Sequence, residues 1–159
     1  MGFAQIRLAT RQDLESIYRI EDRSFSEPYP HNLLAKLLSA CPDSFLVAEL
    51  ESEIVVGYCV AAQEGSFAHL ISLAVLRDYR RRGVGIALIQ AVLANLGSGV
   101  KELRLEVKQG NADAVRLYRK LGFELVDLIE NYYADGSAAV KMRLTLPKAR
   151  NDSAEALGK

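Results

Sequence analysis

The 159-residue sequence predicts an α/β fold, in which helices flank one mixed, mostly antiparallel sheet. The length suits one domain with one substantial core. Three segments rich in β-branched and aromatic residues follow one another between residues 45 and 76 and are joined by short turns, which is typical of an antiparallel meander. Helical patterns lie on either side of this meander. We therefore expect one domain over residues 1–147 and a polar tail over residues 148–159.

The N-terminal quarter predicts a strand and two helices separated by a loop. Thr10 followed by Asp13 resembles a capping arrangement at the start of a helix. Two prolines in SFSEPYP exclude a continuous helix there and predict an ordered loop. The expected elements are a strand at 5–10, a helix to about Ser24, a loop at 24–30 and a helix at 31–40.

The rest of the chain alternates between strand and helix patterns. The segment that starts at Val84 is long and apolar on nearly all sides, as in a buried helix, and Gly97 ends it. Asn111 is suited to cap a second amphipathic helix, and Gly122 to end that helix. The expected elements are strands at 45–50, 54–64 and 67–76, a helix at 84–97, a strand at 102–107, a helix at 111–121 and a hairpin at 123–146.

Composition excludes several classes of protein. Half of the residues are apolar, and 20 Lys and Arg balance 20 Asp and Glu, so the chain is unlike a disordered, membrane-embedded or nucleic-acid-binding protein. Cys41 and Cys59 are not spaced as a metal pair, and we expect two buried thiols and no metal site. The N-terminus lacks the features of a secretory signal, and no apolar stretch reaches the ~18 residues of a membrane span. The expected location is the cytoplasm.

The stretch RRRGVG at residues 80–85 indicates an anion site. A glycine-rich turn between a strand and a helix presents free backbone amides and the positive end of the helix dipole. The spacing does not match an ATP-binding P-loop, and the third glycine of a dinucleotide fingerprint is missing. The alternative is a solvated basic turn with a tight connection.

Two blocks of the sequence resemble a known family. The pattern Arg80-x-x-Gly83-x-Gly85, after LISLAVLRDY and before an apolar helix, resembles the acetyl-coenzyme A loop of the GCN5-related N-acetyltransferases (GNAT). The element order above, β-α-α-β-β-β-α-β-α-β-β, is also that of this family. The resemblance implies acetyl-coenzyme A as the cofactor. It implies cofactor contacts from Leu73, Ala74, Val75, Arg80, Arg81, Arg82, Gly83, Val84, Gly85, Ile86, Asn111 and Tyr118.

A second block narrows the resemblance. LEVKQGNADAVRLYRKLGF and the ending NYYADGSAAVKMRL are similar to segments of the RimI-like and archaeal N-terminal acetyltransferases. This implies transfer of an acetyl group to the α-amino group of protein or peptide N-termini. The sequence leaves open two alternatives, namely a small-molecule amine or lysine side chain as acceptor, and a non-catalytic acyl-coenzyme A binding module.

Acetyl transfer to an amine needs a proton acceptor and an acid for the leaving thiolate. The resemblance implies Glu106 as general base, acting through water, because a free carboxylate is a weak base for an ammonium group. The resemblance also implies that His69 helps to collect the proton and that Tyr118 is the acid near the coenzyme A sulfur. The alternatives are a salt-bridged strand carboxylate, a structural histidine and a core tyrosine.

Two aromatic segments are the expected peptide site. In the subgroup that the sequence resembles, the SFSEPYP loop and the NYYADG hairpin hold the first residues of a peptide, which implies roles for Phe25, Glu27, Tyr29, Tyr132 and Tyr133. The alternative is that these aromatic residues are packed loop anchors. We expect neither nucleic acid nor membrane as partner, and the sequence does not decide between a monomer, a homodimer and a complex with an auxiliary subunit.

Overall fold

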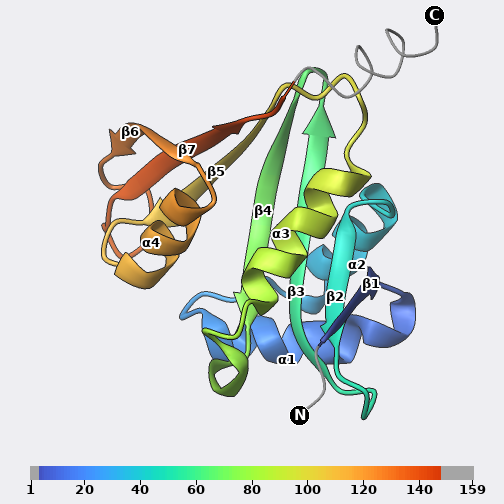
Figure 1. The fold of residues 1–159 in the computed structure, drawn as a ribbon. Helices are drawn as coiled ribbons and strands as arrows, with labels where there is room; N and C mark the ends of the chain where they lie inside the picture. Colours follow the sequence, from blue (N-terminus) through green and yellow to red (C-terminus); the bar gives the residue numbers. More distant parts are fainter. Residues whose placement is uncertain (1–3, 148–159) are drawn as a thin grey trace, which may run out of the picture. The chain divides into compact units, whose positions relative to one another are not determined.

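The computed structural model describes residues 4–147 and confirms the predicted α/β class and element order (Figure 1). The strands are β1 (Gln5–Leu8), β2 (Phe45–Glu49), β3 (Val55–Glu64), β4 (Phe67–Val75), β5 (Glu102–Lys108), β6 (Glu124–Ile129) and β7 (Ala139–Thr145). The helices are α1 (Leu14–Ser24), α2 (His31–Ala40), α3 (Val84–Asn95) and α4 (Ala112–Lys120). The predicted tail at 148–159 lies outside the described residues.

The strands form one sheet in the order β1-β2-β3-β4-β5-β7-β6. β1 with β2, β2 with β3, β5 with β7 and β6 with β7 are antiparallel pairs. β4 and β5 are parallel, with a register that extends over residues 67–69 of β4. The sheet is therefore mixed and mostly antiparallel, as the sequence predicts.

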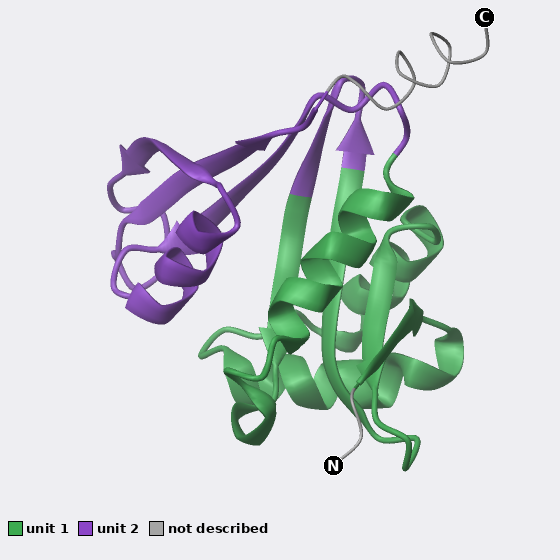
Figure 2. Cartoon of the chain, viewed as in Figure 1, with its two compact units in different colours: residues 1–62, 70–96 green, residues 63–69, 97–159 purple. Residues whose placement is uncertain are grey.

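Contacts between Cα atoms divide the chain into two compact units (Figure 2). Unit 1 comprises residues 1–62 and 70–96, and unit 2 comprises residues 63–69 and 97–159. Strand β4 contributes to both, because its first residues pair with β5 whereas the rest of the strand belongs to unit 1. A single domain over residues 1–147 stays a prediction.

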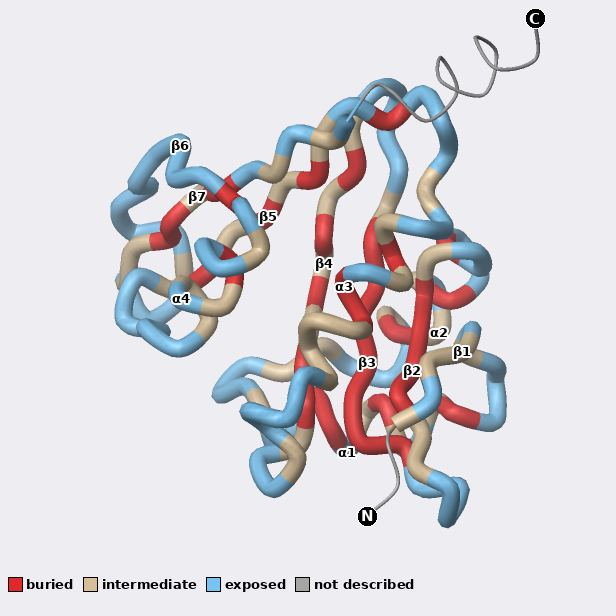
Figure 3. Tube along the Cα trace, in the orientation of Figure 1, coloured by how far each residue is buried: buried red, intermediate tan, exposed pale blue. Residues whose placement is uncertain are grey.

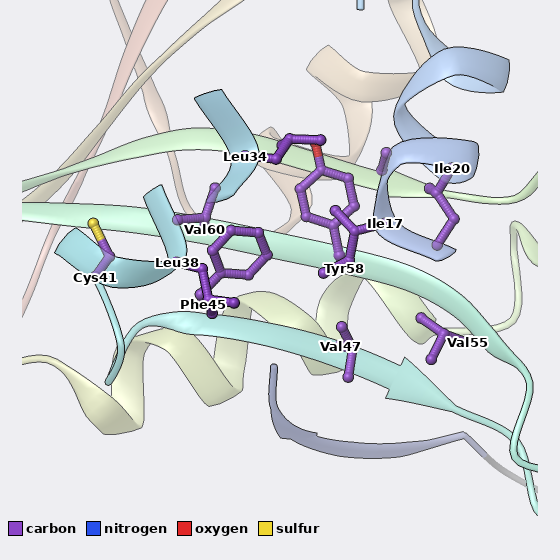
Figure 4. Close-up of a cluster of buried hydrophobic side chains, with 11 residues drawn as sticks. Ile17, Ile20, Leu34, Leu38, Cys41, Phe45, Val47, Val55, Tyr58 and Val60 are labelled. Atoms are coloured by element: carbon purple, nitrogen blue, oxygen red, sulfur yellow. The ribbon is translucent and has the colours of Figure 1, made fainter. Parts of the chain in front are cut away.

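In unit 1, helices cover both faces of the sheet. Ile17 and Ile20 of α1 and Leu34 and Leu38 of α2 pack on one face, around Tyr58 (Figure 4). The opposite face lies against α3, where a Cβ atom on Gly57 would approach a methyl carbon of Leu88 to 3.3 Å and the Cys59 thiol donates to the Leu88 carbonyl. Since both faces are covered, the side chains at 45–48 and 55–61 are all buried, as the red segments of Figure 3 show.

The start of the first helix differs slightly from the prediction. Residues Arg11–Asp13 form a 3₁₀ turn before α1, and the Asp13 carboxylate accepts hydrogen bonds from the Thr10 N–H and hydroxyl at 2.7 and 3.2 Å. Arg7 of β1 donates to Asp13 at 2.8 Å and to Glu49 of β2 at 2.9 Å. The capping carboxylate therefore also ties the helix start to the sheet. Hydrogen bonds from Arg7 hold the pKa of Asp13 below its ordinary value.

Unit 2 contains α4, which follows β5 and precedes β6 and β7 in the chain. Tyr118 of α4 is buried and meets the Phe123 ring edge-on at a centroid distance of 5.4 Å. Gly122 ends the helix with a φ of +100°, as the sequence predicts for this glycine. Strand β6 is exposed along its whole length, including the side chains of Leu125 and Leu128, and forms the end of the strand order (Figure 3).

The two cysteines have the environment that the sequence predicts. Cys41 and Cys59 are free, buried thiols, and burial raises the pKa of both. Across residues 4–147, every helix falls short of the length and apolar character that a membrane span requires.

Candidate active site

The glycine loop forms the start of α3 in unit 1. Gly83 is the residue before the first helical turn and has a φ of +84°, which explains the need for glycine there. A Cβ atom added to Gly83 would meet no atom within 4 Å. The first amides of α3, at Val84, Gly85 and Ile86, precede the first helical hydrogen bond, which runs from the Ala87 N–H to the Gly83 carbonyl. These amides and the open space before them fit an anionic group.

The three arginines before Gly83 have different surroundings. Arg80 donates from Nε to the Val75 carbonyl at 2.7 Å, which ties the loop to the end of β4. Arg82 lies over the Tyr79 ring at 5.6 Å. Arg81 adopts a φ of +63°, an uncommon conformation for a residue with a side chain. The basic stretch is therefore partly structural, with Arg80 fixing the turn.

The proposed cofactor strand is the end of β4. Burial alternates along this strand, so that Leu73 is partly exposed whereas Ala74 and the flanking Ser72 are buried. The register with β5 covers residues 67–69 of β4. Residues 73–75 lie further along the strand. His69 shares the more open face with Leu73, as strand alternation predicts.

In unit 2, His69 and Glu106 form a direct pair. The distance from His69 Nε2 to Glu106 Oε1 is 2.7 Å, and the side chains are 37% and 17% exposed. The two residues lie on neighbouring strands. In the register of β4 with β5, His69 is opposite Arg104, and Glu106 follows two residues later on the same face of β5. Tyr132 completes the group: burial, the charge of Glu106 and a hydrogen bond with Glu106 raise the pKa of Tyr132.

The hairpin between β6 and β7 is held in one conformation by its own contacts. The N–H groups of Tyr132 and Tyr133 both donate to the Ser137 carbonyl, and the two rings stack at a centroid distance of 4.9 Å. Hydrogen bonds from Ser137 hold the pKa of Asp135 below its usual range. Lys108 of β5 pairs with Asp135 at 3.0 Å and lies 5.2 Å from the Tyr133 ring centroid. The two predicted substrate tyrosines therefore belong to one ordered patch beside Glu106.

Asn111 and Tyr118 have structural contacts that the sequence also allowed. The Asn111 side-chain oxygen accepts the Ala114 N–H at 3.2 Å and so caps α4. Its amide nitrogen is a second polar group at the same helix start. Tyr118 is 7% exposed, and its ring packs on Phe123. Nothing in these contacts tests a role in cofactor binding or acid catalysis, and both roles stay predictions.

The predicted substrate loop lies in unit 1 between α1 and α2. Phe25 is 38% exposed, Glu27 is exposed, and Tyr29 is partly buried against the core of this unit. The Tyr29 N–H donates to the Glu21 carboxylate at 2.9 Å. In the sequence, Glu21 follows Ile17 by one helical turn, which is an unusual position for a carboxylate, but the sequence does not name its partner.

The predicted residues thus form two groups within the described part of the chain. Unit 2 brings together His69, Glu106 and Tyr132, with Tyr133 stacked on Tyr132. Unit 1 carries the glycine loop, the end of β4 and the loop before α2. A glutamate and a histidine with a shared hydrogen bond suit proton transfer, and the start of α3 suits an anion.

Comparisons with known proteins identify the family of the chain. The acetyltransferase (GNAT) family model matches residues 14–123. An N-alpha-acetyltransferase of Sulfurisphaera tokodaii is 36% identical over 156 residues, covering 89% of this chain and 93% of that protein. The [ribosomal protein bS18]-alanine N-acetyltransferase of Escherichia coli is 32% identical, covering 76% of this chain and 81% of that protein.

A solved structure is similar over nearly the whole chain. The crystal structure of Ard1 from Thermoplasma volcanium has a TM-score of 0.85 and 35% sequence identity, and the alignment covers 91% of this chain and 98% of that one. The fold, the family match and these relatives confirm the family resemblance that the sequence motifs indicated. The chain belongs to the GNAT acetyltransferase family and is an N-acetyltransferase.

Proposed function

We propose that the protein transfers the acetyl group of acetyl-coenzyme A to the α-amino group of peptide or protein N-termini. The observation that carries this proposal is the pair of His69 and Glu106, with Tyr132 of the β6–β7 hairpin near the same carboxylate. It puts a proton acceptor next to a predicted peptide-binding residue. The N-alpha-acetyltransferases among the relatives support the same acceptor.

Glu106 and His69 supply the route for the proton. An α-amine must be neutral to attack a thioester, so its ammonium proton has to leave before or during C–N bond formation. The Glu106 carboxylate accepts this proton through water, and His69 shares it across the 2.7 Å hydrogen bond. The histidine suits this task because one ring nitrogen of an imidazole can accept a proton while the other donates one.

The start of α3 supplies the cofactor site. The amides of Val84, Gly85 and Ile86 precede the first helical hydrogen bond, a Cβ atom at Gly83 would meet open space, and the loop carries Arg81 and Arg82. Backbone amides at a helix start bind phosphate groups, and the pyrophosphate of acetyl-coenzyme A is such a group. The cofactor brings the activated acetyl thioester, and Tyr118 is the residue we assign to protonate the thiolate that leaves.

Each unit carries one of the aromatic segments that the sequence predicts for binding the acceptor. Tyr132 and Tyr133 of the hairpin and Phe25 and Tyr29 of the loop before α2 offer ring faces and hydroxyls to a peptide, and Glu27 offers a carboxylate to a cationic α-amine. A cytoplasmic location, where new N-termini arise, stays a prediction. An auxiliary subunit is likewise open, although structures of some related folds contain complexes of that kind.

A peptide panel tests the proposal. The full-length protein is incubated with acetyl-coenzyme A and short peptides that differ in their first two residues, and the products are located by tandem mass spectrometry. Acetylation confined to the α-amine is expected. Acetylation of small amines or lysine side chains, with unmodified α-amines, would instead support the alternative acceptors.

A further inference from the structure

Glu21 is a carboxylate in the core of unit 1. Its side chain comes from α1, and the residue is 2% exposed, close to the apolar Ile17 and Ile20 of the same helix. A buried carboxylate is costly unless hydrogen-bond donors satisfy it. The donors around Glu21 therefore indicate why a glutamate is placed there.

One carboxylate oxygen faces two hydroxyl groups of the sheet. The Tyr58 hydroxyl donates to Glu21 Oε1, and the Ser72 hydroxyl lies 3.4 Å from Glu21 Oε1 and 2.8 Å from the Tyr58 hydroxyl. All three residues are buried, and they come from α1, β3 and β4. Burial, followed by the negative charge of Glu21, raises the pKa of Tyr58, so that this hydroxyl remains a donor.

The other carboxylate oxygen faces the loop before α2. Glu21 Oε2 accepts the Tyr29 N–H at 2.9 Å. Tyr29 lies between Pro28 and Pro30, which have no N–H, so it offers the one backbone donor in this tripeptide. Glu21 thus links the Tyr29 N–H of the loop to the Tyr58 and Ser72 hydroxyls of the sheet.

The chemistry of the partners distinguishes this contact from ordinary core packing. A hydroxyl can donate or accept and can turn to suit a new neighbour, whereas a backbone N–H can only donate. Tyr58 and Ser72 would adapt to an uncharged partner in place of Glu21. Tyr29 would not, because its N–H needs an acceptor at that point.

We propose that Glu21 is a positioning residue for substrate binding, which fixes residues 25–30 by accepting the Tyr29 N–H at one carboxylate oxygen, while Tyr58 and Ser72 satisfy the other oxygen. The proposal rests on the proposed role of this loop in binding the peptide. Without the acceptor, the Tyr29 N–H loses this hydrogen bond, and the packing of Tyr29 against the core holds the loop less firmly. Peptide binding weakens, whereas the glycine loop at the start of α3 is not touched.

Three variants of the full-length protein test this. Glu21→Met removes the acceptor at similar volume. Glu21→Gln keeps one oxygen for the Tyr29 N–H and turns its amide towards the two hydroxyls, which can accept. Tyr58→Phe is the control, because it removes a buried hydrogen bond of the same cluster and leaves the contact between Glu21 and Tyr29 in place.

Two readouts decide the outcome. Exchange of the Tyr29 amide hydrogen, followed by NMR, should accelerate about tenfold or more in Glu21→Met, as expected for the loss of a charge-assisted hydrogen bond. The KM for peptide should rise by about the same factor while the Kd for acetyl-coenzyme A stays within about twofold, and Glu21→Gln should restore both values. Tyr58→Phe should leave Tyr29 exchange and the peptide KM close to the parent values, whatever its effect on Tm.

The opposite results would overturn the proposal. If Glu21→Met lowers Tm but leaves Tyr29 exchange unchanged, or if Tyr58→Phe raises the peptide KM equally, Glu21 serves only the core. If the parent protein acetylates no peptide, the proposed function fails, and the amide exchange of Tyr29 still decides whether Glu21 fixes the loop.

Discussion

Replacing Glu106 by glutamine removes a negative charge and the ability to accept a proton, while the size of the side chain and its hydrogen bonding stay nearly the same. The amide can still bond to His69 Nε2, now 2.7 Å from the carboxylate, and to the Tyr132 hydroxyl. The side chain is 17% exposed, and glutamine, which has nearly the same size, keeps its packing. The variant therefore tests proton acceptance and leaves packing intact.

The expected loss is large. A positioned general base contributes about 10²–10⁴ in rate, which corresponds to ~3–5 kcal/mol. We expect kcat/KM for a peptide to fall at least about 100-fold in Glu106→Gln, with the Kd for acetyl-coenzyme A within about twofold of the parent. If Glu106 and His69 form one relay, adding His69→Ala to Glu106→Gln should cost little more than the worse single change.

A matched control lies on the same strand. Glu102 also points to the more open face of β5 and bonds to Arg104, so Glu102→Gln makes the same charge change away from His69. Its kcat/KM should stay close to that of the parent. The assignment of Glu106 is refuted if Glu106→Gln keeps its activity within about threefold, or if Glu102→Gln loses as much.

Three further predictions concern the loop, the acid and stability. Gly83→Val should weaken acetyl-coenzyme A binding about tenfold or more in a calorimetric titration, because it strains a left-handed residue and adds a side chain at the proposed anion site. Gly65→Val, with a φ of +62° in the β3–β4 turn, carries the same strain and should leave binding unchanged. Tyr118→Phe should lower kcat about 10–100-fold with little change in Tm, because the ring packing remains; an unchanged kcat would leave this tyrosine a core residue. Because Arg7 lowers the pKa of Asp13 in the folded state, the folded protein releases this proton more readily than the unfolded chain, so the stabilisation is complete above about pH 4 and is lost as pH falls through the lowered pKa. Asp13→Asn should therefore reduce the free energy of unfolding at pH 7 and flatten its decrease towards pH 3; parallel curves for variant and parent in urea titrations would contradict this.

Much of the fold followed from local sequence signals. The helix at His31–Ala40 has the predicted bounds, because Pro30 fixes its start and the polar CPDS segment follows its end. Gly122 adopts the left-handed conformation that is typical of a glycine just after a helix. The face of His69 followed from strand alternation alone.

The contacts that connect distant segments could not be predicted in the same way. Glu21 bonds to Tyr58 and Ser72, which lie 37 and 51 residues further along the chain. A carboxylate on an apolar helix stripe signals that such partners exist, but not which residues they are. The bond between Arg7 and Glu49 was missed for the same reason, since it depends on the pairing of β1 with β2.

Sequence and structure also contribute differently to the site. The pair of His69 and Glu106 was indicated by resemblance, and the parallel register of β4 and β5 explains why these two side chains meet. The exposed apolar residues of β6 had no counterpart in the prediction, because a strand pattern does not show which strand ends a sheet.

The most direct test compares two peptides of identical composition in one reaction with acetyl-coenzyme A. One has a free α-amine and an acetylated lysine side chain, and the other has a blocked α-amine and a free lysine. The proposed function predicts that the first peptide gains one acetyl group, located on its first residue by tandem mass spectrometry, and that the second stays unchanged. Acetylation of the second peptide alone, or binding of acetyl-coenzyme A without modification of either peptide, would contradict it.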